Sequence, residues 1–355
     1  MSSRYRRLLS VAVAALALTA VFAGCSRAGN TAGQSTHAQD EGAATEVRLG
    51  YFPNVTHAPA IIGVHKDFFA RELGSTKLTA QTFNSGTDEA NALLGGSLDI
   101  GFIGPGPAIN AFTKSGGTIQ VVSGAVSGGA ELVVKPDITT PAQLKGKTLA
   151  TPSKGNTQDV ALKKWLSTTG LSGQVTVANL DNPQAFDAFR NGDIDGGWLP
   201  EPWASQLVLD AGANVLLDEK SRWPDGKFPT TVVVVRTEFL QQHPATVTAV
   251  LKAVLAATDW AAANPADART AVNDGIAELT HDRLSPAVLD RAFSEITLGP
   301  DPDSAAYPQL AQDSVTAGVV RTAANLNGFL DLDLLNKVLS DQHKPAIDAA
   351  GLGGQ

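Results

Sequence analysis

From about Glu46 onward, short apolar runs rich in β-branched residues alternate with longer segments in which apolar residues recur every three or four positions. The first kind of run is typical of strands and the second of helices. The first half of the chain therefore predicts strands at 47–51, 78–83, 99–102, 119–122 and 131–134, and helices at 60–72, 87–94 and 107–113.

The same pattern then begins again, with strands expected at 148–150, 175–178 and 194–197 and helices at 157–168, 184–191 and 201–211. The run 230–235 predicts a buried strand, and nearly all of 238–340 has a helical pattern. Two similar α/β units followed by a helical return predict an α/β protein with two lobes. We place lobe 1 at 46–134 plus 236–355 and lobe 2 at 135–235, with the chain crossing between lobes near 131–135 and 232–236.

The N-terminus has the pattern of an export signal. Arg4, Arg6 and Arg7 precede an apolar run at 8–22 that ends in Phe22-Ala23-Gly24-Cys25. The small residues before Cys25 resemble the lipobox of bacterial lipoproteins, which implies a signal peptide at 1–24 and lipidation of Cys25. A signal cut elsewhere, leaving a free thiol, is the alternative. The Ser-, Gly- and Thr-rich segment 25–45 is typical of a flexible tether.

Composition and charge exclude several classes of protein. The 355 residues contain a single cysteine and carry a formal charge of −8. These values disfavour a disulfide scaffold, a thiolate zinc site and a nucleic-acid surface. Removing residues 1–24, which hold three arginines and no acid, changes the charge to −11. An anion would therefore have to be held by local donors rather than attracted by net charge.

Candidate chemistry follows the predicted strands, in turns rich in Gly, Ser, Thr and Asn that open helices. These turns lie at 52–59, 84–88, 103–107, 151–159 and 198–203. Free N–H groups at a helix start favour an oxyanion, and ligands of open α/β sheets gather beyond the carboxyl ends of the strands. Ordinary helix capping by Ser85 and Asn156 explains part of the same pattern.

The segment Leu49-Gly50-Tyr51-Phe52-Pro53-Asn54-Val55-Thr56-His57-Ala58 resembles the opening of substrate-binding proteins of ABC importers, in the group for aliphatic sulfonates, taurine and nitrate. The segment 150–159, Pro200-Glu201-Pro202-Trp203 and the strand at 230–235 are similar to the same group. The resemblance implies a two-lobe clamp of the type II periplasmic-binding-protein kind, with two crossing strands at the hinge. It also implies a monomer exported to the outer face of the cytoplasmic membrane, with a permease and a separate ATPase as partners.

Carried onto this sequence, the resemblance implies ligand-binding residues but no catalytic residue, metal or cofactor. The candidates are Asn54, Thr56, His57, Ser85, Gly86, Gly104 and Pro105 from the first unit, Ser153, Gly155, Asn156, Thr157, Gln158 and Glu201 from the second, and Ser127 and Thr230 from the crossing region.

The ligand itself is left open. The candidate donors are mostly neutral and include no arginine, which suits a sulfonate or nitrate better than a carboxylate. A carboxylate at Glu201 would suit an amine-bearing sulfonate such as taurine, or would simply stabilise its own helix. A pyrimidine or thiamine precursor is an alternative ligand. An enzyme on the same fold, either a cofactor-free dehydratase or a pyrimidine synthase, is an alternative of another class.

Overall fold

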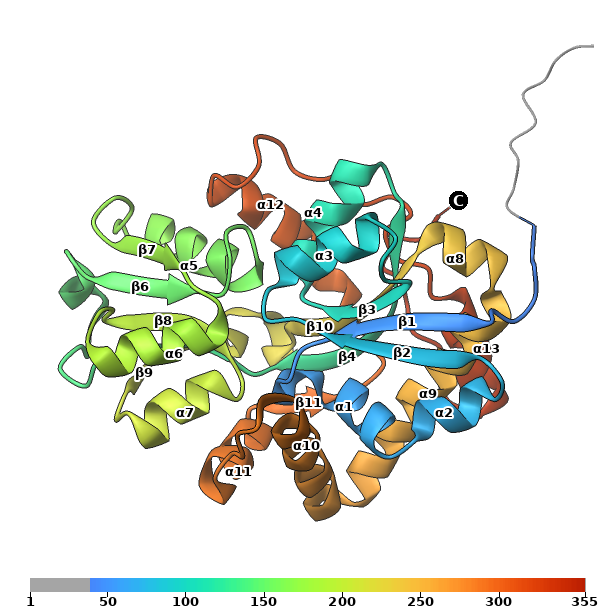
Figure 1. Cartoon of the computed structure of the whole chain (residues 1–355). Helices are drawn as coiled ribbons and strands as arrows, with labels where there is room; N and C mark the ends of the chain where they lie inside the picture. The colour runs from blue at the N-terminus through green and yellow to red at the C-terminus, as the bar shows by residue number, and fades with distance from the viewer. Residues whose placement is uncertain (1–38, 355) are drawn as a thin grey trace, which may run out of the picture. The chain divides into compact units, whose positions relative to one another are not determined.

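The computed structural model describes residues 39–354, so Cys25, the expected signal peptide and most of the expected tether lie outside the described residues. Within this range the chain forms two separate mixed sheets (Figure 1). We call each sheet with its helices a lobe. The first lobe comprises 39–128 and 229–354, and the second comprises 130–226.

The first sheet has the order β11-β4-β10-β3-β1-β2. Strand β1 pairs in parallel with β2 and β3, whereas β10 is antiparallel to both β3 and β4. Its strands are β1 (Glu46–Tyr51), β2 (Lys77–Thr82), β3 (Ile100–Ile103), β4 (Ile119–Gly128), β10 (Pro229–Arg236) and β11 (Ile296–Leu298). All of β10 except Arg236 is buried, as its β-branched run predicts.

The second sheet has the order β7-β6-β8-β5-β9 and repeats this arrangement. Parallel strands β7, β6 and β8 correspond to β2, β1 and β3, and the antiparallel strand β5 corresponds to β10. Its strands are β5 (Ala130–Val134), β6 (Thr148–Thr151), β7 (Thr176–Asn179), β8 (Gly196–Pro200) and β9 (Asn214–Asp218). The prediction of two similar α/β units is confirmed.

The predicted lobe boundaries were wrong by one strand at each crossing. We expected 131–134 in lobe 1 and 230–235 in lobe 2, but β5 lies in the second sheet and β10 in the first. The first crossing therefore lies just before β5, and the return crossing lies just before β10. Strand β5 is buried throughout and β10 at every position except Arg236, so their valine-rich runs predict buried strands without showing which sheet each one joins.

The first crossing needs a glycine pair. Gly128 and Gly129 have φ of 78° and 77°, a conformation that favours glycine. A Cβ on Gly129 would also lie 2.3 Å from the Ile296 side chain. The return crossing runs through the short helices η3 (Glu219–Arg222) and η4 (Pro224–Gly226) into β10.

Helices cover both sheets, and their starts set the geometry of the site. In the first lobe they are η1 (Val55–His57), α1 (Ala58–His65), α2 (Phe68–Leu73), α3 (Gly86–Leu94), α4 (Pro105–Ser115), α8 (Thr237–Gln242), α9 (Pro244–Ala263), α10 (Pro265–Thr280), α11 (Pro286–Ser294), η5 (Ser304–Ala306), α12 (Tyr307–Thr316) and α13 (Asp333–Asp341). In the second lobe they are η2 (Pro141–Leu144), α5 (Thr157–Thr168), α6 (Asn182–Asn191) and α7 (Trp203–Asp210), besides η3 and η4.

Among residues 39–354, α9 alone is long and apolar enough to cross a membrane. However, 56% of its most apolar stretch is buried inside the protein. It packs against α1, α2 and α13. This burial identifies it as a core helix of the first lobe.

Candidate functional site

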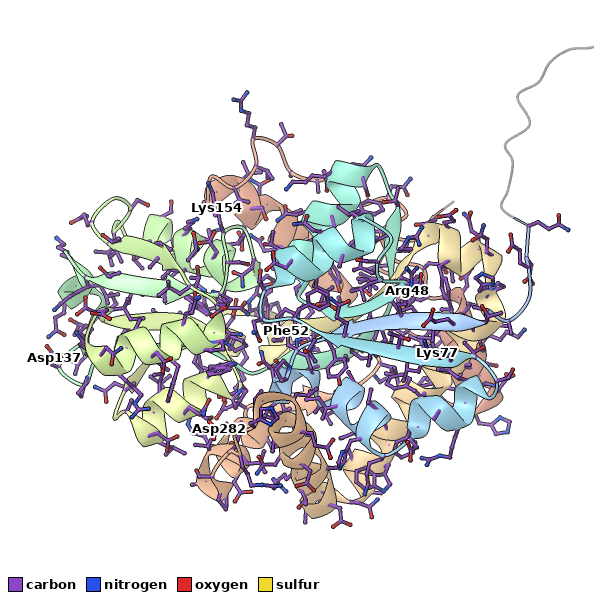
Figure 2. The ribbon with its side chains drawn as sticks, viewed as in Figure 1. Arg48, Phe52, Lys77, Asp137, Lys154 and Asp282 are labelled. Atoms are coloured by element: carbon purple, nitrogen blue, oxygen red, sulfur yellow. The ribbon has the colours of Figure 1, made fainter. Side chains whose placement is uncertain are left out.

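A small cavity of about 30 Å³ lies where the carboxyl ends of the parallel strands in the two lobes face each other. Phe52, which contributes to its wall, lies between the two sheets in Figure 2. The lining residues are Phe52, Asn54, Thr56, His57, Gly86, Gly104, Pro107, Pro152, Asn156, Thr157, Gln158, Asn182, Pro200, Thr230 and Thr231. This is the edge at which ligands of open α/β sheets are expected.

Most of the sequence-predicted site residues line this cavity. They are Asn54, Thr56, His57, Gly86, Gly104, Asn156, Thr157, Gln158 and Thr230. The others lie outside its wall: Ser85, Pro105, Ser127, Ser153, Gly155 and Glu201.

The residues outside the wall have structural partners instead. The Ser85 hydroxyl caps α3 by accepting from Asp88 N. Ser127, at the end of β4, donates to Phe228 O or Asp303 Oδ2, at 3.1 and 2.7 Å. Ser153 Oγ lies 3.2 Å from Thr87 Oγ1 of the other lobe. Pro105 is the first residue of α4 and has no N–H to offer.

Five helices, α1, α3, α4, α5 and α6, begin at the cavity, because the first residue or the N-cap residue of each lines it. Gly86 opens α3, and Gly104 and Asn156 are the N-cap residues of α4 and α5. In α4 the Gly106 N–H donates to Thr157 Oγ1 across the lobes at 3.1 Å. The contact is so close that a Cβ on Gly106 would lie 2.8 Å from Thr157 N. The positive ends of these helix dipoles favour a negative group in the cavity.

The first-lobe wall presents an imidazole and an amide, both buried. His57 Nδ1 accepts from Phe52 N at 3.2 Å, and the ring stacks on Phe52 with centroids 4.6 Å apart. Burial lowers the pKa of His57 to about 3, so the ring is neutral at physiological pH. Asn54 Oδ1 accepts from the indole N–H of Trp203, in the second lobe, at 2.9 Å.

The second-lobe wall is held by a buried carboxylate behind it. Asp159 Oδ2 accepts from Gly155 N at 2.8 Å and from Lys163 Nζ at 2.6 Å. Its Oδ1 accepts from the Thr151 hydroxyl and the Asn179 amide at 3.2 and 3.0 Å. Four donors thus fix the 151–159 loop and orient Asn156, Thr157 and Gln158. Lys154, in the same loop, is exposed and is labelled well away from Phe52 in Figure 2.

Glu201 is turned away from the cavity into an ion cluster between the lobes. Its Oε1 accepts from Arg291 Nη1 at 3.0 Å, and Arg291 Nη2 donates to both oxygens of Glu131 at 2.9 and 2.8 Å. Arg291 also donates to Ser205 Oγ at 2.8 Å. Burial and the Glu131 carboxylate raise the pKa of Glu201 to about 8. Its backbone carbonyl accepts from Thr56 N at 3.3 Å, which ties the two lobes together beside the cavity.

None of the described residues that line the cavity carries a charge. Within 39–354 no group of three His, Cys, Asp or Glu side chains is placed to hold a metal ion. The cavity can therefore bind through neutral N–H and hydroxyl donors and helix ends. This donor set suits a small oxyanion better than a cation.

A family model described as NMT1-like matches residues 40–274, which is more than half of the chain. The chain belongs to the NMT1-like family.

Three similar proteins are named for binding taurine, alkanesulfonates or nitrate. The taurine-binding periplasmic protein of Escherichia coli is 32% identical over 212 residues, which cover 58% of this chain and 64% of that protein. The alkanesulfonate-binding protein of Xanthomonas axonopodis pv. citri, solved with MOPS, is 23% identical with a TM-score of 0.64, covering 78% of this chain and 92% of its own. The nitrate-binding protein of Synechocystis is 17% identical with a TM-score of 0.68, covering 85% and 90%. At these identities the solved structures support the two-lobe α/β fold alone.

Sequence reasoning missed several residues that shape the site. Trp203 is not among the predicted site residues, yet its indole N–H orients Asn54. Arg291 lies in the helical return, ninety residues from Glu201, and no local pattern links the two. Asn182 lines the cavity from the first turn of α6. The sequence Asp181-Asn182-Pro183 after a strand is the same kind of turn as the predicted loops and would have identified it.

Proposed function

We propose that this protein is the solute-binding component of an ABC importer and captures a small organic anion, an aliphatic sulfonate or taurine, between its two lobes. The observation that carries the proposal is the small cavity lined by neutral polar groups from both lobes at the starts of α1, α3, α4, α5 and α6. Relatives whose names state taurine and alkanesulfonate binding support the choice of ligand class.

The size and polarity of the cavity support a small ligand. A space of about 30 Å³ holds little more than a water, so even a taurine-sized ligand requires the lobes to part slightly. The walls offer His57 and Phe52 as ring surfaces, which is a poor match for a large planar heterocycle that needs stacking on both faces. We therefore rank a pyrimidine precursor below a sulfonate as the candidate ligand.

Nitrate is the second candidate, because it is the smallest oxyanion that the same neutral donors can hold. A relative named for nitrate binding shares the fold. In this proposal no residue acts as a catalyst, and delivery depends on a permease and an ATPase carried by other chains. Anchoring through a lipid on Cys25 completes the proposal, with the binding body held outside the membrane.

Isothermal titration calorimetry of the purified protein with ethanesulfonate, taurine, nitrate and a hydroxymethylpyrimidine tests the assignment. We expect saturable binding of a sulfonate and no heat from the pyrimidine. Binding of the pyrimidine alone would refute the ligand class, and turnover of any of these compounds would refute the binding-protein role. Mass spectrometry of protein from a bacterial membrane fraction would detect the acyl groups on Cys25.

A further inference from the structure

Two polar side chains of the first-lobe wall have their orientation dictated by the protein. A backbone N–H can only donate, so the contact from Phe52 N at 3.2 Å makes His57 Nδ1 an acceptor. A neutral imidazole with an unprotonated Nδ1 carries its hydrogen on Nε2. His57 lines the cavity, and Nε2 has no hydrogen-bond partner within residues 39–354. The ring therefore offers an N–H donor of defined position.

The orientation of the Asn54 side-chain amide is fixed in the same way, by a hydrogen bond from Trp203 of the second lobe. The Trp203 indole has an N–H and no acceptor, so the atom 2.9 Å from it must be the amide oxygen of Asn54. The amide nitrogen of Asn54 is then the opposite atom. It is buried and has no partner among the described residues, and Asn54 itself is 2% exposed. A buried N–H donor without a partner is rare in native structures and points to a ligand atom that accepts from it.

The surroundings of His57 supply no charge that would protonate it. The elements packed against its short helix η1 are α1, α11, β4 and β10. Their ionisable groups are His65, which contacts Glu278, and Asp290, Arg291 and Arg236. Arg291 is engaged with Glu131 and Glu201, and Arg236 lies at the far end of β10 against Asp99 and Glu238. Burial is the only cause of the lowered pKa of His57.

We propose that His57 Nε2–H and the Asn54 amide nitrogen form a charge-neutral donor pair that binds oxygens of the ligand's anionic end, with His57 uncharged in both the free and the bound protein. The ligand's identity rests on the proposed function, whereas the state of the imidazole does not. Because the pair only donates, it holds deprotonated oxygens, and the anionic end of a two-ended ligand such as an aminosulfonate lies at the first-lobe wall. Because neither group ionises, binding takes up no proton.

Two measurements test the state of His57. In protein labelled with ¹⁵N-histidine, we expect the His57 spectrum to show the Nε2–H tautomer from pH 5 to pH 8, with and without ethanesulfonate, and the Nε2 resonance to move on binding. Calorimetry at pH 6.5 in two buffers of different ionisation enthalpy should show no proton uptake. An imidazolium in the complex, uptake approaching one proton, or the Nδ1–H tautomer in the free protein would overturn the inference. If no anion binds, the proposed function fails, but the spectrum of the free protein still decides the tautomer.

Variants test the donor pair directly. Asn54→Asp keeps an oxygen for the Trp203 N–H but replaces the donor by a negative atom, and we expect sulfonate binding to weaken by about 100-fold or more. His57→Phe keeps the ring stacked on Phe52 and removes the donor, with an expected loss of about 10- to 100-fold. Lys154 is an exposed lysine of the opposite lobe, so Lys154→Ala is the matched control and should bind the sulfonate as tightly as wild type. Unchanged affinity in a folded Asn54→Asp protein, verified by its thermal transition, would overturn the pair.

Discussion

Replacing Arg291 by methionine should separate the stability of the lobe interface from the chemistry of the cavity. Arg291 comes from α11 of the first lobe and binds Glu131 and Glu201, which both belong to the second. The Glu131 and Glu201 side chains are 4% and 0% exposed, whereas that of Arg291 is 20% exposed. Methionine fills most of the same volume but leaves both acids without a cation.

The size of the effect follows from this burial. Removing one partner of a fully buried ion pair costs about 3–5 kcal/mol. Arg291 retains some solvent, and Glu201 with its raised pKa can stay protonated, so we expect the lower end, about 3 kcal/mol. In a protein of this size that corresponds to a fall in Tm of about 5–10 °C. The ligand affinity should fall as well, since the cluster joins the lobes beside the cavity.

Thermal unfolding followed by circular dichroism measures the stability, and calorimetry with ethanesulfonate measures the affinity. The control is the triple variant Glu131→Gln, Arg291→Met, Glu201→Gln, which removes all the charges together. We expect it to recover most of the lost Tm, because no buried charge is left unpaired. A single Arg291→Met variant as stable as wild type, or a triple variant less stable than the single one, would refute the reasoning.

Two further predictions concern a close contact at the cavity and a buried carboxyl group elsewhere in the second lobe. Gly106→Ala places a Cβ 2.8 Å from Thr157 N of the other lobe. The affinity for a sulfonate, measured by calorimetry, should therefore fall at least about tenfold with Tm unchanged. The control is Gly299→Ala, where the Cβ meets nothing within 4 Å, and this variant should bind the sulfonate normally. Burial raises the pKa of Glu219 to about 8, so its contribution to stability, full below about pH 4.5, is lost as the pH rises towards 8. Wild type should therefore lose up to about 1.4 kcal/mol per pH unit relative to Glu219→Gln between pH 5 and 8 in urea titrations, and parallel curves would contradict this.

The alternating pattern along the chain was sufficient to predict two α/β units, because strand and helix periods are local properties. Elements with weak local signals were missed or merged. The expected helix at 60–72 is two helices, α1 and α2, because Asp67 adopts a left-handed conformation with φ of 58° between them. Strand β11 is only three residues long and pairs with β4 through antiparallel contacts that no local pattern encodes.

The site was predictable where a residue's role depends on its position just after a strand. Asn54, His57, Asn156 and Thr157 lie on such turns and line the cavity. Glu201 lies on such a turn as well, but its side chain points away from the cavity and binds Arg291. The direction of a side chain thus depended on a partner ninety residues away, which a motif cannot supply.

The two chain crossings have a consequence for the order in which this protein can fold. The second lobe is one uninterrupted segment, 130–226, and all five strands of its sheet lie within it. In the first lobe, β10 lies between β3 and β4, so that sheet cannot be completed until residues 229–236 are available, more than a hundred residues after β4. Contacts between distant segments form slowly because long loops must close first. We therefore expect the second lobe to reach its native structure first, leaving the gap between β3 and β4 exposed until β10 arrives.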